Sequence, residues 1–134
     1  MPYWECFYHI VWATKGRAPM IAAHNETLIL DTIENQSIRL KCPVHALNAV
    51  EDHVHVAVSI LPSLSVADWV GRVKGAASKL INDTFPDSLF QWQEGYGVLT
   101  FGPRNLPFIR QYIQNQKAHH RQQTLYTQLE QTES

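Results

Sequence analysis

The chain has 134 residues, 45% of them hydrophobic, which is enough for about one compact domain with a proper core. It contains no run of about 18 apolar residues, so a transmembrane helix is not expected, and its N-terminus lacks the pattern of a signal peptide. The formal net charge of −1 gives no global sign of a nucleic-acid-binding protein, although a local basic patch can suffice. Cys6 and Cys42 are far apart in the sequence, and we expect reduced, buried thiols in a cytoplasmic protein.

Hydrophobic periodicity predicts strands and helices that alternate along the chain. In chain order these are a strand at residues 4–14, a basic turn at 15–19, a helix at 25–42, a hairpin of strands at 44–50 and 53–60, a helix from Val66 that Pro86 ends, a strand at 96–101 and a helix at 106–122. Ser65 and Asp68 resemble a capping box, and Asn105 can cap the last helix. Residues 123–134 are polar, and we expect a frayed or loosely docked tail.

This order of elements predicts an α+β fold. A ferredoxin-like antiparallel sheet carries its helices on one face, so the extra C-terminal helix must lie elsewhere. The side chains of Val54, Val56 and Val58 point to one side of their strand and make a core face. His53 and His55 point to the opposite side, which we expect to be open.

Two imidazoles on one face of a strand, about 7 Å apart, can share a metal ion. Taken alone, however, a His-x-His tripeptide is more often a pair of surface histidines. His9 is interpreted as a sheet histidine, with contact to the metal site as the alternative.

The last predicted helix carries Tyr112 and Gln116 four residues apart, on one side. Tyr112 alone is more often a core aromatic. With a metal site nearby, its hydroxyl is a candidate nucleophile, the Gln116 amide a third metal ligand, and His119 an alternative to Gln116. Four other tyrosines are alternative candidates for the nucleophile: Tyr3, Tyr8, Tyr96 and Tyr126. Of these, we expect Tyr3 and Tyr8 to lie in the core.

His53-Val54-His55, followed some sixty residues later by Tyr112-Ile113-Gln114-Asn115-Gln116, resembles the single-tyrosine HUH transposases of bacterial insertion sequences (200/605 type). The stretches at residues 8–15 and 93–98 are also similar to that family, and the likeness runs from about Tyr3 to His120. It implies a catalytic domain at residues 1–122, an obligate homodimer, use of Mg²⁺ or Mn²⁺, and a 5′-phosphotyrosine intermediate on single-stranded DNA. By position it assigns the metal to His53, His55 and Gln116, and the nucleophile to Tyr112.

The resemblance implies a DNA nicking and strand-transfer enzyme that acts on hairpin-containing single strands. A relative that binds hairpin DNA without cutting it is the alternative, and a metal-dependent hydrolase is a third hypothesis. Relatives often carry serines just before the tyrosine helix, where this chain has Thr100 to Asn105. Phosphate contacts are predicted for six basic side chains: Lys15, Arg17, Arg72, Lys74, Lys79 and Arg104.

Overall fold

The computed structural model describes residues 3–122 and 126–132. Its centre is a four-stranded sheet in the order β2-β3-β1-β4, in which all neighbouring strands are antiparallel. The strands are β1 (Phe7–Ala13), β2 (Val44–Val50), β3 (His53–Ser59) and β4 (Gly97–Phe101). This is the α+β, ferredoxin-like arrangement that the element order predicts.

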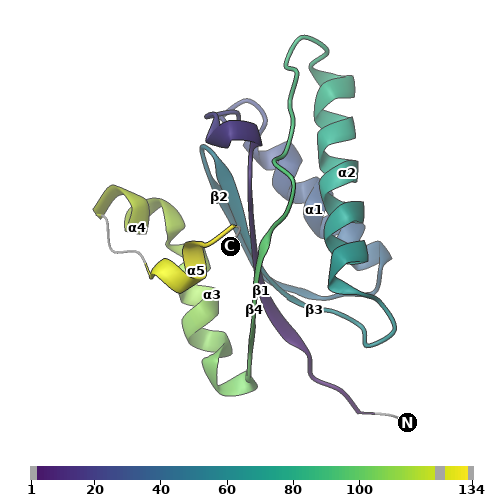
Figure 1. The fold of residues 1–134 in the computed structure, drawn as a ribbon, viewed down its shortest axis with the longest axis vertical. Helices are drawn as coiled ribbons and strands as arrows, with labels where there is room; N and C mark the ends of the chain where they lie inside the picture. Colours follow the sequence, from purple (N-terminus) through teal and green to yellow (C-terminus); the bar gives the residue numbers. More distant parts are fainter. Residues whose placement is uncertain (1–2, 123–125, 133–134) are drawn as a thin grey trace.

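Helices cover both faces of the sheet (Figure 1). On one face lie α1 (Glu26–Arg39) and α2 (Val66–Thr84), and on the other lie α3 (Leu106–Gln114), α4 (Gln116–Gln122) and α5 (Thr127–Glu130). Short 3₁₀ turns, η1 (Lys15–Arg17) and η2 (Pro103–Asn105), complete the fold. In the described part of the chain no helix is long and apolar enough to cross a membrane.

The larger core lies between the sheet and the α1–α2 pair. The valine face of β3 contributes to it as the alternation predicts, and Trp69 of α2 is fully buried. Ser37, which interrupts the apolar stripe of α1, has a structural role there. Its hydroxyl donates to the Cys42 carbonyl at 2.6 Å and accepts from the Trp69 indole at 3.0 Å, so that buried polar groups are satisfied.

A smaller core lies on the opposite face. Buried Ile109 and Ile113 of α3 pack against Ala46 and Ala57 of the sheet, with Leu129 of α5 at the edge of this cluster. Alanines at the contact let a helix approach a strand closely. Because α3 to α5 lie here, the face that carries His53 and His55 is covered, not open.

Several predicted boundaries need correction. The first strand begins at Phe7 rather than residue 4, and Tyr3 is 84% exposed instead of lying in the core. The predicted helix at 106–122 is broken at Asn115, which has φ −100° and ψ 19°. Ser65 caps α2 by accepting from the Asp68 backbone N–H, whereas the Asn105 side chain makes no capping hydrogen bond.

Two further expectations are corrected at the sequence ends. Cys42 is buried, but Cys6 is only half-buried, and both are free thiols. Residues 127–130 form a helical turn that packs on the sheet, where a frayed or loosely docked tail was expected. Residues 123–125 and 133–134 of that tail lie outside the described residues.

Candidate metal and nucleophile site

The two histidines of the His-x-His motif lie on β3, on the face that α3 to α5 cover. His53 is 1% exposed and His55 is fully buried, so the interpretation as a surface pair is wrong. Their neighbours on the adjacent strand are Ala13 and Val11 of β1, which hold β3 in the middle of the sheet. Because β3 is hydrogen-bonded on both sides, the positions of both imidazoles are fixed by the sheet.

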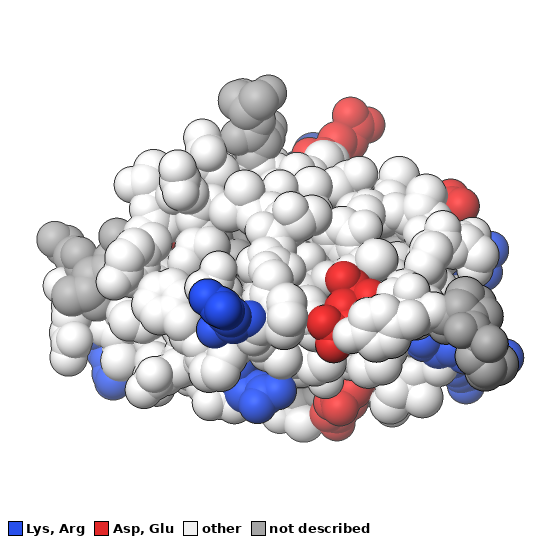
Figure 2. All heavy atoms as spheres, turned by 90° about the horizontal axis from the view of Figure 1, so that it is seen from below, with Lys and Arg blue, Asp and Glu red and all other residues white. Residues whose placement is uncertain are grey.

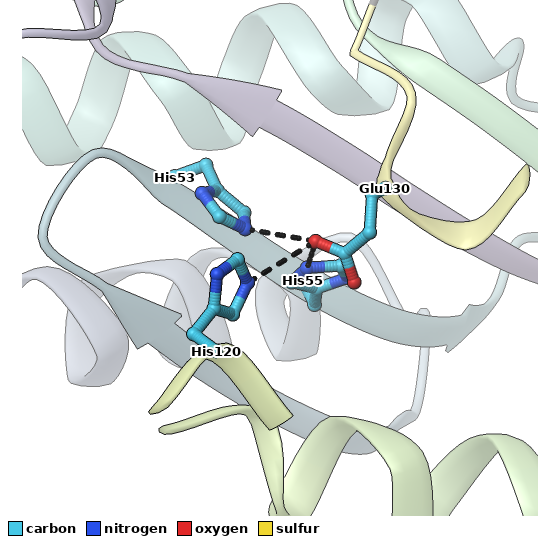
Figure 3. Close-up of side chains that lie close together, drawn as sticks. All are labelled: His53, His55, His120 and Glu130. Atoms are coloured by element: carbon cyan, nitrogen blue, oxygen red, sulfur yellow. Dashed lines mark hydrogen bonds and ion pairs between the residues drawn. The ribbon is translucent and has the colours of Figure 1, made fainter. Parts of the chain in front are cut away.

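Four side chains from three elements converge beside β3 (Figure 3). They are His53, His55, His120 of α4 and Glu130 of α5, and their ligand atoms all lie within 4.8 Å of one another. The Glu130 Oε1 atom is 3.2 Å from His53 Nε2, 3.1 Å from His55 Nε2 and 3.2 Å from His120 Nε2. The dashed lines in Figure 3 mark these contacts.

Tyr112 lies beside the same cluster and in the same chain. Its ring is 2% exposed and its centroid is 6.1 Å from that of His55. The hydroxyl donates to Glu130 Oε2 and accepts from the Tyr126 backbone N–H at 3.1 Å. Burial, together with the contact to Glu130, raises the pKa of Tyr112 to about 12, so the phenol is protonated near neutral pH.

Gln116 is placed next to this cluster despite the helix break at Asn115. Its Oε1 atom lies 3.0 Å from His120 Nε2, and its Nε2 atom lies 3.3 Å from Glu130 Oε2. His119, the alternative to Gln116, does not join the cluster: its ring stacks on Tyr112 at 4.6 Å. The structure therefore brings Tyr112 and Gln116 together with both predicted histidines.

Neighbouring polar groups orient the two motif histidines. His53 Nδ1 lies 2.6 Å from Asp52 Oδ1, and His55 Nδ1 lies 2.9 Å from Nε2 of the buried His9. Each ring thus turns its Nε2 atom toward Glu130. His9 therefore contacts the predicted metal site, which was the alternative interpretation of this residue.

Burial controls the protonation of this site. It lowers the pKa of His55 to about 4 and that of His9 to about 3, so both rings are neutral at pH 7. Burial opposes ionisation of Glu130, yet the contacts with His53, His55 and Tyr112 bring the pKa of its carboxyl below the usual range. A neutral imidazole, such as that of His55, is the protonation state that metal binding needs.

The donor set fits a divalent ion. His53, His55 and His120 turn their Nε2 atoms toward one point, each 3.1 to 3.2 Å from Glu130 Oε1, and the ligand atoms of the cluster all lie within 4.8 Å of one another. Imidazole nitrogens suit first-row transition ions such as Mn²⁺, whereas Mg²⁺ prefers oxygen ligands.

Two members of the cluster were missed by sequence reasoning. His120 follows Gln116 by four residues, so their helical spacing was a signal that could have found it. Glu130 lies in a polar tail with no periodicity, 75 residues from its partner His55. No local pattern marks such a residue.

The six predicted DNA contacts do not gather at this site. Arg72, Lys74 and Lys79 lie on α2, across the sheet from the cluster. Lys74 donates to the carbonyls of Gln93 and Gly95, and Lys79 pairs with Asp83. Lys74 and Lys79 therefore bind groups of the same chain.

Arg17 is the predicted cation nearest to the cluster. It borders the same hollow as His53 and His120 and lies 3.7 Å from Asp52. Lys15 and Arg104 are exposed on the 3₁₀ turns. On the face shown in Figure 2, basic and acidic side chains are few and intermixed, which agrees with the near-neutral net charge.

Comparison with known proteins relates this site to transposases. The family model "Transposase IS200 like" matches residues 2–116. The transposase for insertion sequence element IS200 of Salmonella typhimurium is 29% identical over 119 residues, covering 84% of this chain and 78% of that protein. The ISDra2 transposase TnpA of Deinococcus radiodurans is 24% identical over 115 residues, covering 81% and 82%.

Solved structures give the same answer for the fold. A candidate transposase of Deinococcus radiodurans superposes with a TM-score of 0.70 and 26% identity, covering 86% of this chain and 93% of that one. A REP-associated tyrosine transposase bound to a REP hairpin has a TM-score of 0.68 at 10% identity, with 90% and 72% covered. At 10% identity the latter likeness concerns the fold alone. The match to the family model spans most of the chain, and this protein therefore belongs to the IS200-like transposase family.

Proposed function

We propose that this transposase nicks single-stranded, hairpin-containing DNA with Tyr112 and transfers the cut strand through a 5′-phosphotyrosine bond. The observation that carries the proposal is the convergence of Tyr112 with His53 and His55 around one carboxylate. A buried phenol beside a set of metal-binding imidazoles is an arrangement that core packing alone does not require. Membership of a transposase family supports DNA as the substrate.

In the proposed reaction the Tyr112 oxygen forms a bond to the scissile phosphorus. The bond from phosphorus to the 3′-oxygen breaks, the phenol proton passes to water, and the departing oxygen gains a proton. Attack of another 3′-hydroxyl on the phosphotyrosine reverses these changes. The phosphodiester energy is kept in the tyrosine bond, which agrees with the absence of a GxxxxGK[ST] nucleotide-binding motif from the sequence.

His53, His55 and Gln116 would hold a divalent ion, Mg²⁺ or Mn²⁺, and His120 is in position to join them. When bound, the ion would polarise the phosphate and stabilise the charge that develops in attack. The chain's own residues hold the parts together: β3 fixes two imidazoles, α3 places the tyrosine, and α4 supplies the remaining donors. This arrangement of β3, α3 and α4 would keep the nucleophile within reach of the phosphate.

The experiment is adduct formation on a fluorescent single-stranded hairpin oligonucleotide, read on a denaturing gel with Mg²⁺ or Mn²⁺. Wild type should give a protein–DNA adduct and a free 3′-hydroxyl end. Tyr112→Phe should lose the adduct while keeping the wild-type circular dichroism spectrum. Tyr126→Phe is the matched control, since Tyr126 lies beside Tyr112 but is 53% exposed. Cleavage by Tyr112→Phe would instead assign the attack to a water molecule, as in a metal-dependent hydrolase.

A relative that binds hairpin DNA without cutting it is the second candidate. It is favoured by one observation, namely that the Tyr112 hydroxyl is engaged by Glu130 and its pKa is raised to about 12. Such a protein would bind the oligonucleotide but give no adduct with either metal, even after prolonged incubation.

A homodimer is also part of the proposal. An uncovered histidine face is not a reason for dimerisation here, because α3 to α5 of the same chain cover that face. Support comes from the family resemblance and from exposed apolar side chains on the edge strand β4 and on α3, among them Leu99, 40% exposed, and Phe108, 47% exposed. Edge strands with apolar surface favour association.

A further inference from the structure

Glu130 introduces an anionic side chain between the two groups that phosphate chemistry needs. Its Oε1 atom faces the Nε2 atoms of His53, His55 and His120 at 3.1 to 3.2 Å, and its Oε2 atom accepts from the Tyr112 hydroxyl. A scissile phosphate must make the same two-sided contact. One of its oxygens has to reach the ion that the imidazoles would hold, while its phosphorus faces the tyrosine.

We propose, on the basis of the DNA-cleaving function above, that the Glu130 carboxylate occupies the binding site of the scissile phosphate. The C-terminal segment (residues 126–132) then competes with a DNA strand for this site. A carboxylate and a phosphodiester each carry one negative charge, and two such groups repel each other strongly in a site shielded from water. Only one of them can bind at a time.

The C-terminal segment is docked by contacts that do not involve the Glu130 charge. Leu129 packs against the buried Ile109–Ile113 cluster. Thr132 is 4% exposed and accepts from Arg17 Nη1 at 3.3 Å. Figure 1 shows the segment lying along the same side of the sheet as α3 and α4.

Backbone contact with β4 is part of this docking. A Cβ atom added at Gly97 would lie 2.7 Å from the Gln131 carbonyl carbon and would overlap its oxygen. Gly97 lies in β4, and the three heavy atoms nearest to its added Cβ belong to the backbone of Gln131 and Thr132. Gly97→Ala therefore loosens the C-terminal segment without altering a proposed ligand.

In the closed form the C-terminal segment is docked with Glu130 in the site, and in the open form it has left the site. Because only the open form binds DNA, the apparent affinity is the intrinsic affinity multiplied by the fraction of open molecules. If closed molecules outnumber open ones by about ten to one, removal of the competitor raises DNA affinity by about tenfold. The same variants should form adduct faster at subsaturating DNA, because chemistry begins only after the segment leaves.

The test measures fluorescence anisotropy of a labelled single-stranded hairpin oligonucleotide in EDTA, so that metal binding does not contribute. Glu130→Gln keeps the size of the side chain and removes its charge, and we expect a gain in affinity of about tenfold. Gly97→Ala should shift affinity in the same direction. Glu34→Gln is the matched control: it makes the same change in net charge on the exposed surface of α1 and should bind like wild type.

Affinity of Glu130→Gln within twofold of wild type, or below it, overturns the proposed phosphate site. So does loss of adduct formation in Glu130→Gln with Mn²⁺, because Glu130 would then be needed for the chemistry. A failure of the cleavage function looks different. In that case Glu130→Gln gains affinity in EDTA, yet neither it nor wild type forms an adduct with either metal.

Discussion

His9 offers a direct test of how the metal site is held. Its Nε2 atom lies 2.9 Å from His55 Nδ1, and both rings are at most 1% exposed. If His55 binds the ion through Nε2, its Nδ1–H must donate to His9, which fixes the tautomer and the ring orientation. We predict that His9→Leu, which fills the buried position with an apolar side chain but removes the acceptor, weakens Mn²⁺ binding.

The expected loss is about 10- to 100-fold, the range for removing such a partner of a ligand, or about 1.4 to 2.7 kcal/mol. The upper part of this range applies here, because burial leaves little room for water to replace the lost acceptor. His9 Nδ1 has no hydrogen-bond partner within the described part of the chain, so the contact with His55 is its polar role. His9→Gln, whose amide can accept, should recover part of the affinity.

Titration calorimetry with Mn²⁺ measures the effect. His45→Leu is the control, because His45 contacts Ser59 at 2.7 Å on a neighbouring strand and is not a member of the histidine–carboxylate cluster. Its Mn²⁺ affinity should stay within twofold of wild type. The reasoning is refuted if His9→Leu binds Mn²⁺ as wild type does, or if His45→Leu weakens binding equally through a general loss of stability.

Further predictions concern stability and assembly. Ile113→Ala removes a fully buried side chain from the smaller core and should lower the free energy of unfolding by about 2–5 kcal/mol in urea titrations. Ser65→Ala removes the cap of α2 and should cost about 1 kcal/mol by the same assay. Mixing Tyr112→Phe with His53→Ala subunits tests the dimer: restored adduct formation indicates a tyrosine acting across two chains, whereas no restoration agrees with the contact seen within one chain.

We predict that His53→Ala lowers the free energy of unfolding by more than the sequence alone suggests. A histidine on an open strand face would cost about 0.5 kcal/mol on removal. His53 is instead buried and contacts both Asp52 and Glu130. Its loss leaves these polar partners without a hydrogen bond, which should lower the free energy of unfolding by about 1–3 kcal/mol. Thermal unfolding of the variant without metal separates these two magnitudes.

The sequence by itself determined the sheet and its first helical layer. The strands at Val44–Val50 and from His53 were predicted at their observed starts, because alternation and the Glu51–Asp52 turn are local signals. The helix beginning at Val66 was equally clear from its apolar period and its Ser65 cap. Spacing also placed His53 and His55 on one face, and Tyr112 with Gln116 on one side.

Only the tertiary structure decided what covers the histidines. Periodicity reports which side of an element is apolar, but it does not say which distant segment will pack there. Ala46 and Ala57 allow α3 to approach the second face, and this contact moves His53 and His55 from a supposed surface into the interior.

The position of Glu130 shows the same limit most clearly. A single carboxylate in a polar tail has no period, cap or motif, and its role depends on meeting His55 across 75 residues of chain. That meeting results from the packing of Leu129 and the burial of Thr132 against surfaces that exist only after the sheet and α3 have assembled. Local sequence determines the elements, whereas the convergence of side chains at a site is a property of their packing.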